Sequence, residues 1–277
     1  MKKISRRSFL AAAAVSAAAL AMTACGGSAS SAASSVASSA ASSTAAASGA
    51  AALSTVLAGK LTMATNATFP PYEMTTDSGE IEGIDVDTAK AIAEKLGLEL
   101  QIDDMEFDAA LLSVQQGKAD IVMAGVTVTD ERKAVMDFSD SYATGIQSII
   151  VPNDSDIASP DDLAGKKIGT QRGTTGYIYC SDDFGEDSVV AYDSGLTAVQ
   201  ALNNGQVDAV VIDNAPATEY VAANPGLKVL DTSYAEEDYA IGMAKGSALE
   251  DAVNKALEEL KADGTLQAIV DKYINAN

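Results

Sequence analysis

The stretch FDAALLSVQQGKADIVMAG, residues 107–125, indicates the fold class. Its first half has the apolar spacing of an amphipathic helix, and Gly117 stands where such a helix ends. Its second half, ADIVMAG, is a short apolar run of the kind that forms a buried strand. VQALNNGQVDAVVID, residues 199–213, aligns without gaps with residues 111–125. A helix, glycine and strand unit that occurs twice predicts an α/β protein with two similar halves.

The segments before this stretch continue the alternation of strands and helices. KLTMAT (60–65) and LELQID (98–103) are predicted strands, and DVDTAKAIAEKLG (85–97) is a predicted helix closed by its final glycine. A weaker echo relates residues 59–69 to residues 165–175, where a strand leads into a polar loop in both copies. We therefore expect βαβ units in each half.

The composition excludes several functions. The chain has 18 Lys and Arg against 39 Asp and Glu, and four of the cations lie in residues 1–24, which contain no acid. The remaining residues thus carry 14 minus 39, a net charge of −25. Because phosphate backbones require a basic surface, nucleic acid is not an expected partner. The chain has no His, which removes imidazole as a base or metal ligand, and we expect neither a metal nor a cofactor.

The N-terminal stretch MKKISRRSFLAAAAVSAAALAMTAC has a basic start, an apolar run and small residues before Cys25. This is the pattern of an export signal, assigned to residues 1–24. MTAC resembles a bacterial lipobox, which implies lipidation of Cys25, and SRRSFL resembles a twin-arginine signal, so both export routes stay open. Residues 25–55 are expected to be a lipidated Ser/Ala-rich linker. The predicted location is extracytoplasmic, on the cell membrane through a lipid anchor.

Polar residues follow the predicted strands at four places: 66–69, 125–127, 171–175 and Asp213. Ligands of open α/β sheets lie beyond the carboxyl ends of strands, so two facing halves would bring these four places to one cleft. A free amino acid needs a fixed cation for its carboxylate and a fixed anion for its ammonium group. Arg132 offers a two-pronged carboxylate donor, and Asp213 offers an acceptor for the ammonium.

With these residues in place, the body of the chain resembles a bacterial family 3 extracellular solute-binding protein, the amino-acid-binding component of a polar amino acid ABC transporter. The matching motifs stand in order over nearly everything after Leu57: FPPYEM (69–74), GEIEGIDVDTAKAIAEKLG (79–97), residues 107–142, DDLAGKKIGTQRGTT (161–175), GQVDAVVIDNAP (205–216) and YAIGMAKGS (239–247). The resemblance implies a two-lobed type II periplasmic-binding-protein-like fold, with a mixed sheet flanked by helices in each lobe and a two-strand hinge. It places residues 57–148 plus 240–277 in lobe 1 and residues 149–239 in lobe 2.

The resemblance also implies roles at the common part of the ligand. Arg132 would hold the carboxylate with help from Thr127 and Thr175. Asp213 and the Gly125 carbonyl would hold the ammonium group. Two alternatives from the residues alone stay open: Arg132 as a surface ion-pair partner and Asp213 as a helix cap.

For the ligand side chain, the resemblance implies a sandwich between Phe69 and Phe107, with Asn66 and Gln171 at the far end. The neutrality of these two amides favours a polar uncharged ligand such as glutamine or cystine. An inward-facing Arg172 would instead admit an acidic ligand. The expected site consists of Asn66, Phe69, Phe107, Ala124, Gly125, Thr127, Arg132, Gln171, Thr175 and Asp213.

The expected partners are a free amino acid and a membrane permease with its cytoplasmic ATPase, and the chain is expected to be a monomer and not an enzyme. Two rival functions remain: an enzyme of the same fold, of the hydro-lyase or cell-wall lytic type, and a ligand sensor for a membrane receptor. Cys180 is expected to be a packed residue, since no His activates it. The acid pair Glu236 and Glu237 is expected to lie on the solvated surface.

Overall fold

The computed structural model describes residues 53–274. The expectations for the signal segment 1–24, for Cys25 and for the linker up to residue 52 therefore lie outside the described residues. Within residues 53–274, none of the helices has the length and apolar character needed to cross a membrane.

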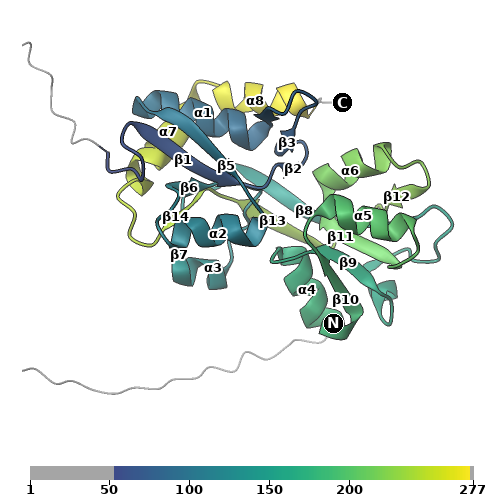
Figure 1. Cartoon of the computed structure of the whole chain (residues 1–277). Helices are drawn as coiled ribbons and strands as arrows, with labels where there is room; N and C mark the ends of the chain where they lie inside the picture. Colours follow the sequence, from purple (N-terminus) through teal and green to yellow (C-terminus); the bar gives the residue numbers. More distant parts are fainter. Residues whose placement is uncertain (1–52, 275–277) are drawn as a thin grey trace, which may run out of the picture. The chain divides into compact units, whose positions relative to one another are not determined.

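The first of two large sheets has the strand order β5-β1-β6-β14-β7 (Figure 1). β1 pairs in parallel with β5 and β6, whereas β14 is antiparallel to both β6 and β7. The sheet is therefore mixed, as expected. Its strands are β1 (Lys60–Thr65), β5 (Glu99–Asp104), β6 (Ile121–Val122), β7 (Met136–Phe138) and β14 (Gly242–Ala244).

Helices cover both faces of this first sheet. Side chains alternate along β1 and β6, so that Met63 and Ile121 join one apolar cluster while Ala64 and Val122 join another. Three helices contact one another over the first cluster, and α2 contacts β1 and β14 on the second. The helices of this sheet are α1 (Ile84–Leu96), α2 (Phe107–Gln115), α3 (Asp130–Val135), α7 (Glu250–Ala262) and α8 (Thr265–Tyr273).

The second large sheet has the order β10-β9-β11-β8-β12, and β13 pairs with β8. β9, β10 and β11 are parallel, whereas β8 runs antiparallel to β11, β12 and β13. Its strands are β8 (Ala143–Pro152), β9 (Ile168–Gln171), β10 (Val189–Tyr192), β11 (Ala209–Asp213), β12 (Leu227–Val229) and β13 (Ala235–Tyr239). A small third sheet, β2-β3-β4, comprises Thr68–Phe69, Glu73–Thr75 and Ile81–Glu82.

The second sheet is also covered on both faces. Val211 of β11 lies in a cluster with Cys180 of α4, while Val210 and Ile212 lie in a cluster with Ala198 of α5. This alternation means that α4 covers one face and α5 the other. The helices are α4 (Thr175–Phe184), α5 (Gly195–Asn203) and α6 (Asn214–Ala222), with short 3-10 turns at Pro160–Leu163 and Glu186–Ser188.

The chain passes twice between the two large sheets. It leaves the first sheet after β7 and enters the second at β8, and it returns from β13 to β14. Near the return, Thr127 forms an isolated bridge with Tyr239. Two mixed sheets with flanking helices and two crossings agree with the expected architecture. The expected lobe boundaries stay a prediction. β8, a strand of the second sheet, begins at Ala143, whereas the first segment of lobe 1 was expected to extend to residue 148.

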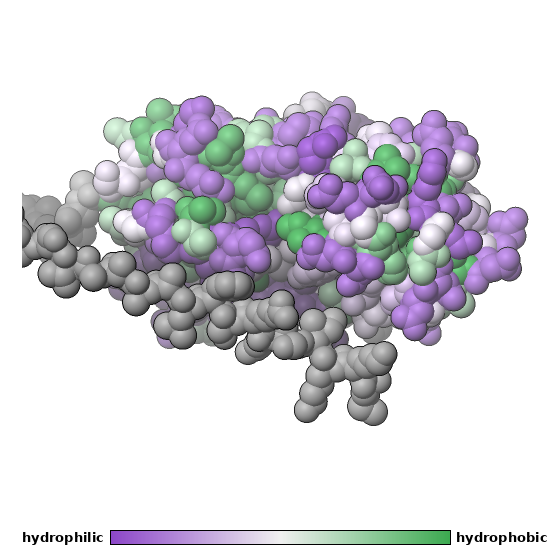
Figure 2. Space-filling model, turned by 90° about the horizontal axis from the view of Figure 1, so that it is seen from below, coloured by the Kyte–Doolittle hydropathy of each residue, from purple (hydrophilic) through white to green (hydrophobic). Residues whose placement is uncertain are grey.

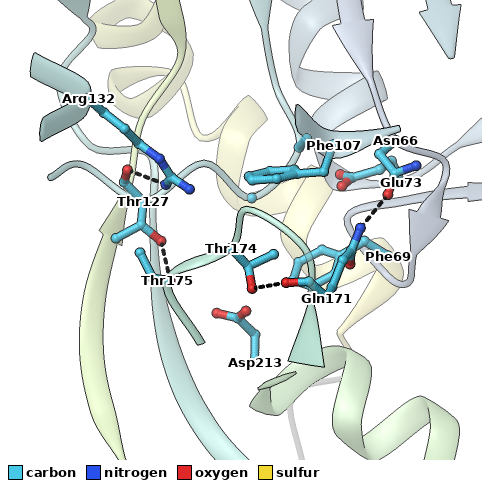
Figure 3. Close-up of a pocket in the computed structure, with 12 residues that line it drawn as sticks. Asn66, Phe69, Glu73, Phe107, Thr127, Arg132, Gln171, Thr174, Thr175 and Asp213 are labelled. Atoms are coloured by element: carbon cyan, nitrogen blue, oxygen red, sulfur yellow. Dashed lines mark hydrogen bonds between the residues drawn. The ribbon is translucent and has the colours of Figure 1, made fainter. Parts of the chain in front are cut away.

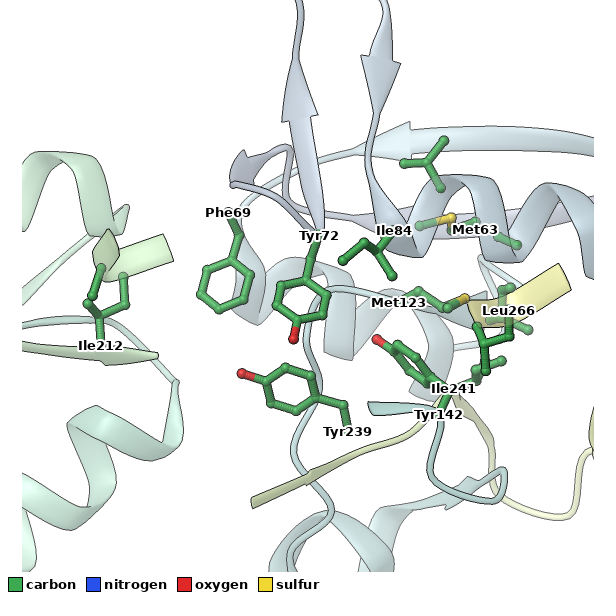
Figure 4. Close-up of a cluster of buried hydrophobic side chains, with 14 of the residues drawn as sticks. Met63, Phe69, Tyr72, Ile84, Met123, Tyr142, Ile212, Tyr239, Ile241 and Leu266 are labelled. Atoms are coloured by element: carbon green, nitrogen blue, oxygen red, sulfur yellow. The ribbon is translucent and has the colours of Figure 1, made fainter. Parts of the chain in front are cut away.

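Aromatic side chains fill the space where the two sheets approach each other. Figure 4 shows Phe69, Tyr72 and Tyr239 between Ile212 of the second sheet and the aliphatic core of the first. The ring of Tyr72 lies 5.8 Å from that of Phe69 and meets the ring of Tyr239 edge to face at 5.3 Å. This packing brings the ends of β1, β6, β9 and β11 into one region.

Exposed apolar side chains are spread over many elements. Leu112 on α2, Ile146 on β8, Ile178 on α4 and Leu196 on α5 are examples among the described residues. The face in Figure 2 mixes hydrophilic side chains with smaller hydrophobic groups.

Candidate functional site

A pocket lies where the strand ends of the two sheets meet (Figure 3). All ten residues predicted from the sequence line it, and so do two that were not predicted, Glu73 and Thr174. The residues come from segments far apart in the chain. The full lining is Asn66, Phe69, Glu73, Phe107, Ala124, Gly125, Thr127, Arg132, Gln171, Thr174, Thr175 and Asp213.

Arg132 sits in the first turn of α3, where Thr129 caps the helix by accepting a hydrogen bond from the Arg132 backbone N–H. Its side chain is only 8% exposed. The guanidinium donates to the Thr127 carbonyl at 2.7 Å and to the Gly173 carbonyl at 3.2 Å, and it lies 5.4 Å from the centre of the Phe107 ring. Burial lowers the pKa of Arg132. The surface ion-pair alternative is therefore wrong, and the remaining N–H groups of the fork are free to bind an anion.

Two threonines lie beside Arg132: Thr127 from the loop after β6 and Thr175 from the start of α4. The Thr127 and Thr175 hydroxyls are 3.4 Å apart, and Thr127 donates to a carboxylate oxygen of Glu237 at 3.0 Å. The expectation of a solvated Glu237 is wrong, because Glu237 is buried and only Glu236 is exposed. Side-chain alternation along β13 explains the difference: Glu237 and Tyr239 point to the same buried face.

Asp213 ends β11 and stands just before α6, but its side chain does not cap that helix. It accepts instead from the Tyr239 hydroxyl and, at 2.9 Å, from the side-chain amide of Gln147. Burial, together with the nearby charge of Glu237, raises the pKa of Asp213 to about 7. The pocket thus holds a buried carboxyl group as well as a buried guanidinium.

Gly125 has a left-handed backbone with φ of 56°, a conformation that favours glycine. A Cβ atom there would also meet the Phe69 ring at 2.8 Å. Its backbone N–H donates to Asp85 at 3.0 Å, which fixes the loop after β6 against α1. The turn therefore needs glycine both for its dihedral angle and for the close approach of Phe69.

Asn66 and Gln171 meet across the pocket. The Gln171 amide donates to the Asn66 side-chain oxygen at 2.8 Å, and the Asn66 amide donates to the Met105 carbonyl at 2.9 Å. Arg172 points the other way: it is exposed, donates to the Ala191 carbonyl at 3.3 Å and lies 3.6 Å from Asp193. This opposite orientation of neighbouring side chains removes the condition for an acidic ligand.

Nucleophile and metal chemistry have little support here. Cys180 is buried against the second sheet, and desolvation raises the pKa of its thiol to about 12. Among residues 53–274, no group of three or more His, Cys, Asp or Glu could hold a metal ion.

Comparison with known proteins places this arrangement in a family. Residues 61–276 match the model of bacterial extracellular solute-binding proteins, family 3. The chain is 33% identical over 223 residues to the L-cystine-binding protein TcyJ of Escherichia coli K12, covering 79% of this chain and 84% of TcyJ. It is 35% identical over 202 residues to the ABC transporter glutamine-binding protein GlnH of Bacillus subtilis, covering 71% and 74%.

A solved structure agrees with these relatives. The arginine-, lysine-, histidine-binding protein ArtJ of Geobacillus stearothermophilus superposes with a TM-score of 0.76 at 35% identity, covering 79% of this chain and 96% of ArtJ. These relatives are solute-binding transport proteins and not enzymes, which confirms the expectation on catalysis. The chain belongs to the bacterial extracellular solute-binding proteins, family 3.

Proposed function

We propose that this protein binds a free polar amino acid in the pocket of Arg132 and Asp213 and delivers it to an ABC transporter permease. The observation that carries the proposal is that the buried guanidinium of Arg132 and the buried carboxyl group of Asp213 line the same pocket. These are the two charges that a zwitterion needs. Relatives that are named as binding proteins for cystine, glutamine and arginine support the same class of ligand.

The two poles of the ligand have separate partners in this proposal. The α-carboxylate bonds to Arg132, Thr127 and Thr175, which lie together at one side of the pocket. The α-ammonium bonds to Asp213 and the Gly125 carbonyl. A carboxylate gains more binding free energy from a desolvated guanidinium than from one at the surface, because less water competes for the same N–H groups.

Closure of the two lobes is the proposed signal to the permease. Arg132 donates to Gly173, Gln171 donates to Asn66, and Thr127 lies at hydrogen-bonding distance from Thr175, and each of these contacts joins the two proposed lobes. A ligand that touches both walls binds the closed form better than the open form and shifts the population toward it. We assign residues 57–148 plus 240–277 and residues 149–239 to the moving lobes.

The finer expectations remain predictions. Family members are extracytoplasmic proteins, and we propose lipid anchoring through Cys25 and a monomeric state for this chain. The uncharged side chains of Asn66 and Gln171 favour a neutral ligand such as glutamine or cystine. Those two amides bond to each other, however, and an acid that was not predicted, Glu73, also lines the pocket.

Isothermal titration calorimetry with free L-amino acids tests the proposal. We expect at least one polar amino acid to bind with one site per chain, and its amide lacking the α-carboxylate charge to bind far more weakly. Mass spectrometry of small molecules carried through native purification identifies the ligand independently. Failure of every free amino acid to bind the folded protein would overturn the proposal.

A further inference from the structure

Glu73 is a buried acid at the pocket that accepts no hydrogen bond from any group among the described residues. It follows Tyr72 in β3, is 0% exposed, and lines the pocket near Asn66 (Figure 3). Neither of its carboxyl oxygens receives a hydrogen bond, and it belongs to none of the six ion pairs of residues 53–274. Because such a group is costly to bury, an unpaired acid in a binding pocket points to a partner that the ligand supplies.

The group that interacts most strongly with Glu73 is another carboxyl group, that of Asp85, which donates no hydrogen bond when it is ionised. Asp85 of α1 is fully buried, accepts from the Tyr142 hydroxyl at 2.7 Å and accepts from the Gly125 N–H at 3.0 Å. Both Asp85 oxygens accept hydrogen bonds and neither donates one. Glu73 can therefore form a hydrogen bond with Asp85 only when Glu73 itself carries the proton. Burial and the charge of Asp85 raise the pKa of Glu73 well above its ordinary value, in agreement with a shared proton.

Acidic groups outnumber cationic groups in the pocket region. Four buried carboxyl groups, those of Glu73, Asp85, Asp213 and Glu237, lie in or beside it, against the single buried guanidinium of Arg132. A zwitterion with a neutral side chain adds no net charge to this set. A ligand with a cationic side chain adds one positive charge where the acids are in excess.

The two neutral amides of the pocket are already engaged. Gln171 donates to Asn66 at 2.8 Å, and Asn66 donates to Met105 at 2.9 Å. They close the pocket beside Glu73 and leave Glu73 as the acid at that end without a donor. Specificity for the ligand side chain therefore falls on Glu73.

We infer that Glu73 is the specificity-determining acid of the site and that the ligand is an amino acid with a cationic side chain, a guanidinium or an ammonium group that donates to Glu73. This rests on the proposed function and names its substrate class. When a cation binds, the Glu73 carboxyl loses its proton to solvent and becomes a carboxylate. The charged and titratable groups around it are Asp85, Asp104, Asp213, Tyr72, Tyr142 and Tyr220.

The experiment is calorimetry of the purified protein with L-arginine, L-lysine, L-glutamine and L-cystine, in two buffers of different ionisation enthalpy. The variant is Glu73→Gln, which keeps the size and removes the acid. The matched control is Glu80→Gln, an exposed acid next to the same small sheet. Thermal unfolding of the ligand-free proteins checks the fold, and Glu73→Gln is expected to melt at or above the wild-type temperature because it removes an unpaired buried acid.

For wild type and Glu80→Gln, we expect arginine or lysine to bind at least about tenfold more tightly than glutamine and cystine, a difference of one charged contact, and to release more protons on binding than the neutral amino acids do. Glu73→Gln is expected to lose that preference and the extra proton release with the cationic amino acids, while it keeps its affinity for the neutral amino acids and the proton release from Asp213.

Two results would overturn the inference. Tighter binding of glutamine or cystine to wild type refutes the cationic class and leaves amino acid binding intact. An unchanged arginine-to-glutamine ratio in folded Glu73→Gln refutes the role of Glu73. If that variant does not fold, the wild-type ratio and proton release still decide. Absence of binding by all four, and by every other free amino acid, refutes the proposed function itself.

Discussion

Replacing Arg132 by alanine tests the anchoring of the ligand carboxylate. Arg132 is 8% exposed, and its guanidinium donates two hydrogen bonds, to the Thr127 carbonyl at 2.7 Å and to the Gly173 carbonyl at 3.2 Å. Its other N–H groups are the cationic donors available to a carboxylate on this side of the pocket. Without them the ligand carboxylate would be desolvated next to Glu237, with only hydroxyl and backbone donors.

The expected loss follows from that burial. Truncating one partner of a buried, hydrogen-bonded charge pair costs about 2–5 kcal/mol. At about 1.4 kcal/mol for each factor of ten, this corresponds to roughly 30-fold to 4,000-fold weaker binding. Arg132→Lys keeps the charge but not the planar fork, so its affinity is expected to fall between wild type and Arg132→Ala.

Calorimetry with the best-binding amino acid measures this effect, and circular dichroism confirms that each variant is folded. The ligand-free variants should unfold near the wild-type temperature, because the Arg132 side chain has no acidic partner in an ion pair among the described residues. Wild-type affinity in folded Arg132→Ala would refute the assignment of Arg132 as the carboxylate anchor.

Three further predictions concern the rest of the site. The pKa of Asp213 is raised to about 7, so the folded state keeps a proton that the unfolded state loses near pH 4. The free energy of unfolding that Asp213 contributes therefore falls as pH rises from about 4 to 7. Ionisation of Asp213 through pH 7 strengthens its binding of the ligand ammonium group. Affinity for a neutral amino acid such as glutamine should rise about tenfold from pH 6 to pH 8, and titrations of Asp213→Asn with the same amino acid should show weak binding without this rise. Gln171→Ala removes the 2.8 Å bond to Asn66 and should cost about 0.5–1.5 kcal/mol of affinity, seen as faster ligand release in stopped-flow fluorescence; unchanged release would contradict it. Gly145→Ala pushes a Cβ into the Tyr239 ring and should destabilise the protein by about 1–3 kcal/mol in urea unfolding, whereas Gly226→Ala, which meets no atom within 4 Å, serves as the control.

Much of the fold could be predicted because its signals are local. The strand at 60–65 matches β1, and the helix expected at 85–97 is α1, which ends as predicted at Gly97 with φ of 71°. The repeated unit at 111–125 and 199–213 corresponds to α2 with β6 and α5 with β11. The strand in the first copy is shorter than its apolar run, since β6 pairs only over Ile121–Val122.

The acids of the site divide into predictable and unpredictable ones. Asp213 could be found because it ends an apolar strand. Glu237 could have been found from β13, where it alternates with Tyr239, but two adjacent acids resemble a solvated surface in sequence. Glu73 lies in a strand of three residues, Glu73–Thr75, which is too short for any periodic signal. Its burial depends on the packing of Tyr72 and α1, which are contacts that a sequence pattern does not encode.

The strands that cross between the sheets also take part in the binding network. Gln147 of β8 donates from one amide nitrogen to Asp213 at 2.9 Å and to Glu237 at 3.0 Å, while Tyr239 of β13 donates to Asp213. Glu237 in turn accepts from Thr127 at 3.0 Å. In the proposed complex, a ligand ammonium group at Asp213 and a ligand carboxylate at Thr127 would therefore both bond to members of one connected hydrogen-bond network. Because three members of that network, Gln147, Glu237 and Tyr239, lie on β8 and β13, a ligand at either pole would change the bonding of the strands that we propose as the hinge.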